Sequence, residues 1–248
     1  MLTLYHYWSS VCSQKVRFCL SEKGLEWESR HIDLFTFDHW QPHYLALNPK
    51  AVVPTLDHDG NVLIESNVIV EYLNDMFSGI SLSPVEPLAK SRMRLWLYDS
   101  EAIAHSNVNT ASYNPRHAPR LARFSKEQLM ETASGHPNRN LRIRMLKRAE
   151  QGVLAEEEDT AYANLEDLLD RMEASLANGP WLLGEAFGLA DIAMAPFINR
   201  IEVLERPIII DASIRPRIAE WWHRIQNRPG FKTAFSFANP NADDPIKR

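Results

Sequence analysis

Two short motifs between residues 53 and 66 carry groups that could bind a small peptide. The first is Val53-Pro54, in which a proline stands at the head of a predicted strand and cannot donate a ladder hydrogen bond. If the bond between the two residues is cis, the chain turns sharply there. The backbone N–H and C=O of Val53 would then be open to an extended peptide lying alongside, as an added strand.

The second motif, Glu65-Ser66, stands where a helix is predicted to begin. A helix N-terminus has unpaired N–H groups and a partial positive charge, which favour a carboxylate. The Ser66 hydroxyl can donate to such a carboxylate and Glu65 can accept from an ammonium, so the pair suits a zwitterionic amino-acid end. The structural alternative is that Ser66 is an ordinary helix cap and Glu65 a favourable acid in the first turn.

Alternating strands and helices in the first eighty residues must position these groups. The apolar spacing and the turn residues predict strands at 2–7, 25–34, 54–57 and 62–64, a helix ending at Gly24, and a helix over 66–77. The order of elements is βαβ followed by ββα. The connection at 35–51 is longer and has room for one helical turn.

Helical patterns dominate the rest of the chain. The clearest helix is 159–179, where apolar residues form one stripe: Ala161, Leu165, Leu168, Leu169, Met172 and Leu176. Further helices are predicted over 88–106, 189–205 and 213–230. The sequence therefore predicts a first domain at 1–78, a linker at 79–87 and an all-α second domain at 88–248.

Composition excludes several classes of protein. The 248 residues carry a formal net charge of −5, with 45% apolar and 24% charged residues, which gives no electrostatic case for binding nucleic acid or an anionic membrane. No apolar run is long enough to span a bilayer, and the N-terminus lacks the features of a signal peptide. Cys12 and Cys19 lie seven apart around one predicted helix, so we do not expect them to pair; a reducing, cytoplasmic setting is the simplest interpretation.

Basic residues outnumber acidic ones between Arg116 and Arg148. One interpretation is a solvated loop and helix surface. The other is a positive rim that attracts an anionic co-substrate.

Long stretches of the chain resemble the cytosolic glutathione transferases. The segments "SSVCSQKVRFCLSEKGLEWE" and "LNPKAVVPTLDHDGNVLIESNVIVEYL" are similar to the family's N-terminal domain, specifically its serine-dependent zeta and theta classes. The segments "WLLGEAFGLADIAMAPFI" and "RIQNRPGFKTAF" resemble its C-terminal helices. The resemblance implies an α/β thioredoxin-like domain followed by an all-α domain, glutathione as co-substrate, a cytoplasmic homodimer and a role in detoxification.

The resemblance also assigns residues to glutathione. It implies that Val53, before Pro54, pairs with the cysteinyl backbone and that Glu65 and Ser66 hold the γ-glutamyl end. His39, nine residues before the Asn48-Pro49 pair, is the candidate for the glycyl carboxylate, although it could be a surface histidine. Many relatives have glutamine or lysine where this chain has Val52, so one carboxylate contact is lost or is supplied by Lys50.

A thiol must lose its proton to attack, and "WSSVCSQK" offers four groups that could help at the start of the first helix. The zeta-type alignment favours Ser10 as the hydroxyl that donates to the glutathione sulfur. Theta-type spacing favours Ser13, and Cys12 and Ser9 follow as candidates. Each serine could instead be a helix cap, and Cys12 a small buried filler. We expect no metal ion.

Other residues look structural or belong to a second-substrate pocket. Asp191 is interpreted as the acid of a capping box behind Gly188, and at least one of Trp221 and Trp222 as core. The pocket for the second substrate is expected between the two domains. Its candidates are Tyr98, His105, Tyr113 and His117.

The resemblance leaves several functions open. The main hypothesis is attack of the glutathione thiolate on a small apolar electrophile. The 137–200 region, with "RIRMLKRAEQGVLAEEED", also resembles bacterial β-aryl etherases, which displace a phenol from lignin-type ethers. Isomerase or dehalogenase chemistry would use the same thiolate. A redox protein that forms mixed disulfides through Cys12, and a non-catalytic glutathione-binding module, are the remaining alternatives.

Overall fold

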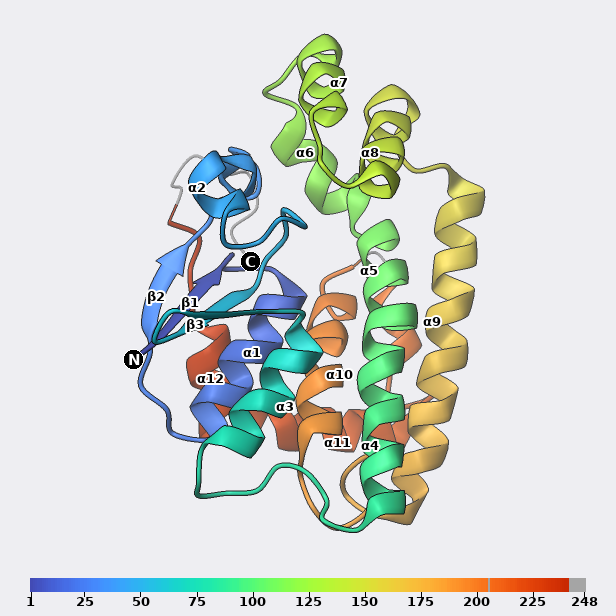
Figure 1. Ribbon diagram of the computed structural model, residues 1–248. Helices are drawn as coiled ribbons and strands as arrows, with labels where there is room; N and C mark the ends of the chain where they lie inside the picture. Colours follow the sequence, from blue (N-terminus) through green and yellow to red (C-terminus); the bar gives the residue numbers. More distant parts are fainter. Residues whose placement is uncertain (205, 241–248) are drawn as a thin grey trace.

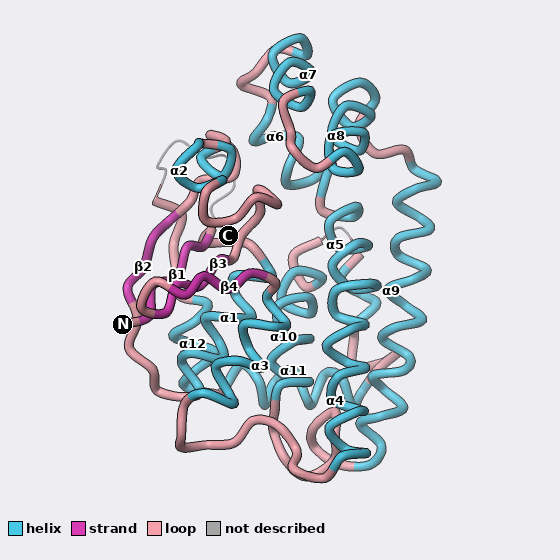
Figure 2. The backbone as a smooth tube through the Cα atoms, viewed as in Figure 1, coloured by secondary structure: helices cyan, strands magenta, loops and turns pink. Residues whose placement is uncertain are grey.

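A computed structural model describes residues 1–204 and 206–240 of the chain. The first part contains a small sheet flanked by helices, and everything after it is helical (Figures 1 and 2). This arrangement confirms the predicted fold class, an α/β thioredoxin-like half followed by an all-α half.

The sheet has four strands in the order β2-β1-β3-β4. Their bounds are β1 Leu2–His6, β2 Glu28–His31, β3 Thr55–His58 and β4 Asn61–Ile64. Strand β1 runs parallel to β2 and antiparallel to β3, which pairs with β4 in a hairpin. Leu4 and Leu56 face each other across β1 and β3 and are fully buried, so the alternation of apolar residues fixes the register. Strand β2 is shorter than the predicted 25–34.

Three helices accompany the sheet: α1 Val11–Glu22, α2 Pro42–Leu45 and α3 Ser66–Met76. Helix α1 packs against α3, α10 and α12, so apolar and polar side chains on all its faces are buried (Figure 1). Val16, Phe18 and Leu20 have no exposed surface, and neither does Lys15. A lysine on this helix therefore needs polar partners inside the protein.

The helical half contains more helices than the sequence predicts. The bounds are α4 Pro87–Asp99, α5 Ser106–Ala111, α6 Ala118–Leu121, α7 Lys126–Ser134, α8 Arg139–Gln151, α9 Ala155–Ser175, α10 Leu189–Ile201, α11 Pro216–Asn227 and α12 Pro229–Phe235. The predicted helix 88–106 is longer, because a π-helical turn at Ser100–His105 joins α4 directly to α5. Helices α6, α7 and α8 fill a region for which no element was predicted, and they project beyond the rest of the helical half (Figure 1).

The last helix returns to the first half of the chain. The Arg17 Nε donates to the carbonyl of Ala234 at 2.9 Å, and the rings of Phe18 and Phe231 lie 5.8 Å apart. One hydrophobic core thus runs through both halves. Helix α12 belongs to the helical half but packs on α1 at least as closely as it packs on the helices of its own half. The linker at 79–87 therefore stays a prediction about the chain.

Asp191 and Trp221 have the structural roles predicted for them. The buried Asp191 carboxylate accepts from the N–H groups of Gly188 at 3.1 Å and Leu182 at 3.0 Å, and from the Trp221 Nε1–H at 2.8 Å. Trp221 has no exposed surface. Within residues 1–204 and 206–240, no helix combines the length and apolar character needed to cross a membrane.

Candidate functional site

Two adjoining cavities lie between the sheet half and the helical half. The first, which we name the polar cavity, measures about 290 Å³ and is lined by residues that include Lys50, Val53, Glu65, Ser66 and Glu101. The second, which we name the aromatic cavity, measures about 330 Å³ and is lined by residues that include Phe35, Phe37, Tyr113, His117 and Arg200. Seven residues line both cavities: Cys12, Val52, Val53, His105, Asn109, Leu141 and Arg144. A ligand in one cavity can therefore touch a ligand in the other along this shared wall, which includes Cys12, Val53 and His105.

The Val53–Pro54 bond is cis, and Val53 borders both cavities. The preceding carbonyl, of Val52, is held by the Tyr44 hydroxyl at 2.7 Å and by the Asn48 amide at 2.9 Å. Within the described residues, the backbone N–H and C=O of Val53 have no hydrogen-bond partner. They are available to the backbone of a bound peptide.

Glu65 and Ser66 lie in the polar cavity at the start of α3. Glu65, not Ser66, holds the N-cap position, and its φ of 71° is a conformation that a residue with a Cβ rarely adopts outside functional sites. The Glu65 side chain makes no cap hydrogen bond; it pairs with Lys50 at 2.5 Å. Ser66 is therefore not a helix cap, and the Glu65 carboxylate points to a cation.

Lys15 is a site residue that the sequence analysis missed. Its buried ammonium donates to the Ser66 hydroxyl at 3.2 Å, to Asn67 Oδ1 at 2.6 Å and to the Ser100 hydroxyl at 3.1 Å. Burial lowers the pKa of Lys15, and the nearby Cys12, Glu101 and Glu65 partly offset that effect. The position of Lys15, three residues after Cys12 and four before Cys19 on a single helix face, was the available signal.

The three serines near the start of α1 differ in what their hydroxyls can reach. Ser10 is the N-cap residue: its hydroxyl oxygen accepts from the Ser13 N–H at 3.3 Å, and the residue lines the aromatic cavity. Ser9 lines the same cavity, and its carbonyl accepts from Arg200. Ser13 has no exposed surface, accepts from the Tyr7 N–H at 3.4 Å and lines neither cavity. The structure brings Ser9 and Ser10 to the site but not Ser13.

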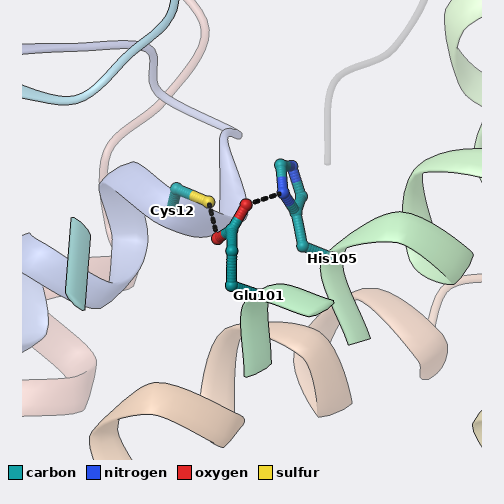
Figure 3. A group of neighbouring side chains, drawn as sticks. All are labelled: Cys12, Glu101 and His105. Atoms are coloured by element: carbon teal, nitrogen blue, oxygen red, sulfur yellow. Dashed lines mark hydrogen bonds and ion pairs between the residues drawn. The ribbon is translucent and has the colours of Figure 1, made fainter. Parts of the chain in front are cut away.

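Cys12 forms a cluster with two residues of the π-helical turn, Glu101 and His105 (Figure 3). The His105 Nδ1 lies 2.8 Å from one Glu101 oxygen, and the other Glu101 oxygen lies 3.9 Å from the Cys12 sulfur. Sequence reasoning placed His105 near the site but missed Glu101, because regular helix periodicity does not reveal a π turn.

The charges in this cluster support a thiolate. Burial opposes ionisation of the Cys12 thiol, but the neighbouring His105 and Lys15 outweigh it, so the pKa of Cys12 is lowered. In return, the charge of Cys12 and the contact with Glu101 overcome burial and raise the pKa of His105 to about 10. A thiol, an imidazole and a carboxylate could also hold a divalent metal, since their ligand atoms lie within 4.8 Å of one another. The ion pair between His105 and Glu101 already gives both groups a charged partner, without a metal ion.

The remaining candidates divide between the cavities. His39 and Val52 line the aromatic cavity, and burial lowers the pKa of His39 to about 3, so its imidazole is neutral. Tyr113 and His117 also line that cavity, as predicted for a second-substrate pocket. Tyr98 does not: it is 67% exposed on α4 and borders neither cavity, so it was wrongly included.

Comparisons with known proteins give similarity over nearly the whole chain. Models of the glutathione S-transferase N-terminal and C-terminal domains match residues 9–76 and 143–224. The chain is 30% identical to a tetrachloro-p-hydroquinone reductive dehalogenase of Sphingobium chlorophenolicum, covering 94% of this chain and 95% of that one. It is 31% identical to protein LigF of a Sphingobium strain, over 100% of this chain and 97% of that one. The crystal structure of β-etherase LigF superposes with a TM-score of 0.88 at 29% identity, covering 94% of this chain and 98% of that one. Glutathione transferase F7 of Populus trichocarpa superposes with a TM-score of 0.71 at 25% identity, covering 96% and 100%.

Proposed function

This chain is a member of the glutathione S-transferase family, and from that premise we propose that it joins glutathione, through its sulfur, to an aromatic electrophile held in the aromatic cavity. The observation that carries the proposal is the meeting of the two cavities at Cys12, Val53 and His105. A tripeptide in the polar cavity would bring its central residue to this junction, where an electrophile in the other cavity can be reached.

The polar cavity has the groups that glutathione needs. The γ-glutamyl ammonium would meet the Glu65 carboxylate, and its carboxylate would accept from the Ser66 hydroxyl and the α3 N-terminus. The cysteinyl backbone would pair with Val53. The glycyl end would then extend toward Val52 and His39, where the neutral imidazole can give one hydrogen bond but no ion pair.

Two features would favour the thiolate form of bound glutathione. The Ser10 hydroxyl uses its oxygen to cap α1, which leaves its proton free to donate to sulfur. The α1 N-terminus adds a partial positive charge, whereas the charge of His105 is already matched by Glu101. A hydrogen bond to a charged group and a helix N-terminus together are worth roughly 2–4 kcal/mol, which is enough to lower a thiol pKa by about two units.

Among electrophiles, we propose an aryl ether in which carbon is joined to a phenolic oxygen. The glutathione sulfur forms a bond to that carbon, the carbon–oxygen bond breaks, and the phenolate leaves and takes up a proton. Two observations favour this substrate class: the phenylalanine and tyrosine walls of the aromatic cavity, and the similarity to β-etherase LigF over nearly the whole length of both chains.

A glutathione-dependent substrate screen tests the proposal. Purified protein is incubated with glutathione and an aryl ether, an aryl halide or an epoxide, and the thioether and the released phenol are identified by mass spectrometry. We expect thioether formation with the aryl ether and its loss without glutathione. Retention on immobilised glutathione should weaken by roughly 1–3 kcal/mol in Ser66→Ala but not in the exposed Ser91→Ala. No thioether from any of the three electrophiles, together with no retention, would leave only a scaffold role.

Reductive dehalogenation is a second candidate, favoured by Cys12. Replacing a carbon–halogen bond by a carbon–hydrogen bond needs two electrons, which two glutathione thiols supply when they become a disulfide. A thiolate beside the glutathione sulfur can carry the intermediate mixed disulfide, and Cys12 lies at the junction with a lowered pKa. Cys12→Ser should then retain thioether formation but stop the release of oxidised glutathione; if halide loss in the parent yields only a thioether, this candidate fails.

A further inference from the structure

The wall of the aromatic cavity carries positive charge and no acidic side chain within the described residues. Its basic members are four arginines and four histidines: Arg120, Arg144, Arg148, Arg200, His39, His105, His117 and His136. The polar cavity differs, because Glu65 and Glu101 face Lys50 and His105 there. Burial lowers the pKa values of His39, His117 and His136, and His105 faces Glu101, so the positive charge of the aromatic cavity comes from its arginines. The needs of zwitterionic glutathione are met in the polar cavity, which leaves Arg148 and Arg200 without an assigned ligand.

Arg200 gives the strongest indication of a site for an anion. Its side chain reaches the cavity from α10 and only 6% of the residue is exposed. A guanidinium has five N–H donors. Within residues 1–204 and 206–240, Arg200 makes a single hydrogen bond, at 2.6 Å to the neutral carbonyl of Ser9. A buried cation with no anionic partner is costly, so a ligand that supplies one would be bound strongly.

Arg148 reaches the same cavity from α8 and also has neutral partners. Its guanidinium donates to Asn109 Oδ1 at 2.7 Å and to the Thr110 hydroxyl at 3.2 Å, and it lies 5.0 Å from the centre of the Tyr113 ring. These contacts fix the orientation of the guanidinium and leave other N–H groups available. Burial, with the charge of nearby arginines, lowers the pKa of Arg200 to about 9 and that of Arg148 to about 10, both still charged at neutral pH.

We propose that Arg200 and Arg148 form an anion subsite, and that the electrophile is an aromatic acid whose carboxylate is bound there while its reactive carbon faces the glutathione sulfur. The inference rests on the proposed transferase function. Burial lowers the pKa of His117, and both guanidiniums lie near enough to lower it further. Each guanidinium has N–H groups that can donate to a carboxylate, and Phe35 and Tyr113 supply the walls for the ring. Neither arginine lines the polar cavity, so we assign the subsite to the electrophile and not to glutathione.

The test compares an aromatic acid with its own neutral ester. Chloronitrobenzoate and its methyl ester both react slowly with glutathione without any protein, by displacement of chloride. The measured quantity is the enzymatic kcat/KM divided by the uncatalysed rate constant, which removes the difference in intrinsic reactivity. We expect this acceleration to be roughly tenfold or more greater for the acid, the usual worth of a charge-assisted hydrogen bond.

Arg148→Gln and Arg200→Gln should each reduce the ratio of acid to ester acceleration by roughly 10- to 100-fold, through the KM of the acid and not the KM of glutathione. Arg30→Gln, an equal charge change on an exposed residue of β2, should leave the ratio as in the parent. Equal acceleration of acid and ester would overturn the anion subsite while leaving the transferase function intact. A loss of glutathione affinity in both variants would assign the arginines to glutathione instead. No acceleration of either compound would count against the proposed function itself.

Discussion

The hydroxyl of Ser10 and the thiol of Cys12 lie two residues apart in the sequence but can do different chemistry. Ser10 accepts a backbone N–H through its oxygen and can still donate its proton into the cavity. Ser13 also accepts a backbone N–H, from Tyr7, but it is fully buried and lines neither cavity, so its proton cannot be donated into the site. The lowered pKa of the Cys12 thiol favours reaction of its sulfur. We therefore propose thiol activation for Ser10 and thiol exchange for Cys12.

Ser10→Ala should raise the pKa of the bound glutathione thiol by about one to two units, because one hydrogen bond to the thiolate is lost. The pKa is measured from thiolate absorbance in the ultraviolet as a function of pH. Ser13→Ala is the matched control and should leave it unchanged. If the pKa of bound glutathione changes in Ser13→Ala, or stays the same in Ser10→Ala, a group other than the Ser10 hydroxyl donates the hydrogen bond to the thiolate.

His105→Gln should raise the pKa of the Cys12 thiol, because it removes the cation that stabilises the thiolate. Alkylation of Cys12 in the absence of glutathione should then be slower at neutral pH, and its pH midpoint should move upward. The measurement is the rate of iodoacetamide labelling against pH, read by mass spectrometry at Cys12. His43→Gln, a change at an exposed histidine of α2, should have no effect. If His105→Gln leaves the pH dependence of labelling unchanged, Lys15 alone lowers the pKa of the Cys12 thiol.

The π-helical turn between α4 and α5 decides which side chains of that long helix reach the site. It brings Glu101 and His105 to Cys12, while Tyr98, before the turn, points to solvent. Motifs with strict backbone requirements, such as Val53-Pro54 and Glu65-Ser66, could be predicted from the sequence. Glu101 and Lys15 could not, because their roles depend on helix irregularity and on burial from all sides, which apolar periodicity does not record.

Asp191→Ala should lower the free energy of unfolding by about 3 kcal/mol, because it leaves three buried N–H donors without an acceptor. These donors belong to Leu182, Gly188 and Trp221, so the change should loosen the start of α10 and its contact with α11. Urea denaturation followed by tryptophan fluorescence measures the effect. Asp167→Ala, at an exposed position of α9, should change stability by less than about 0.5 kcal/mol. If Asp191→Ala lowers the free energy of unfolding no more than the control does, the Asp191 carboxylate does not stabilise the fold.

The two halves of the molecule contribute differently to the cavities. The half with the sheet supplies backbone and short polar groups, whose spacing in the sequence is distinctive. The helical half supplies Tyr113 and His117 from one π-helical turn, Arg148 from α8 and Arg200 from α10, and their meeting depends on how α6, α7 and α8 pack over the site. The fold class, and the placing of Val53 and Glu65-Ser66 in one cavity, could therefore be predicted from the sequence. The shape and charge of the aromatic cavity could not.

Apolar side chains on α3 and α4 favour the homodimer that the family resemblance implies. Val68 and Met76 on α3 are 54% and 56% exposed, and Leu95 and Tyr98 on α4 are 62% and 67% exposed. The Arg94 guanidinium bonds Glu71 at 2.8 Å, so the two helices lie together. Exposed apolar groups gathered on one face mark an interaction surface.

We propose that α3 and α4 form the dimer contact; Leu95→Glu should then dissociate the dimer, because a carboxylate would be buried there without a partner. Sedimentation equilibrium should give twice the 28.5 kDa chain mass for the parent and the single mass for the variant. Ile143→Glu, at a 53% exposed position of α8, introduces the same charge elsewhere and should stay dimeric. A monomeric parent would exclude the dimer altogether, and a dimeric Leu95→Glu would move the interface away from α4.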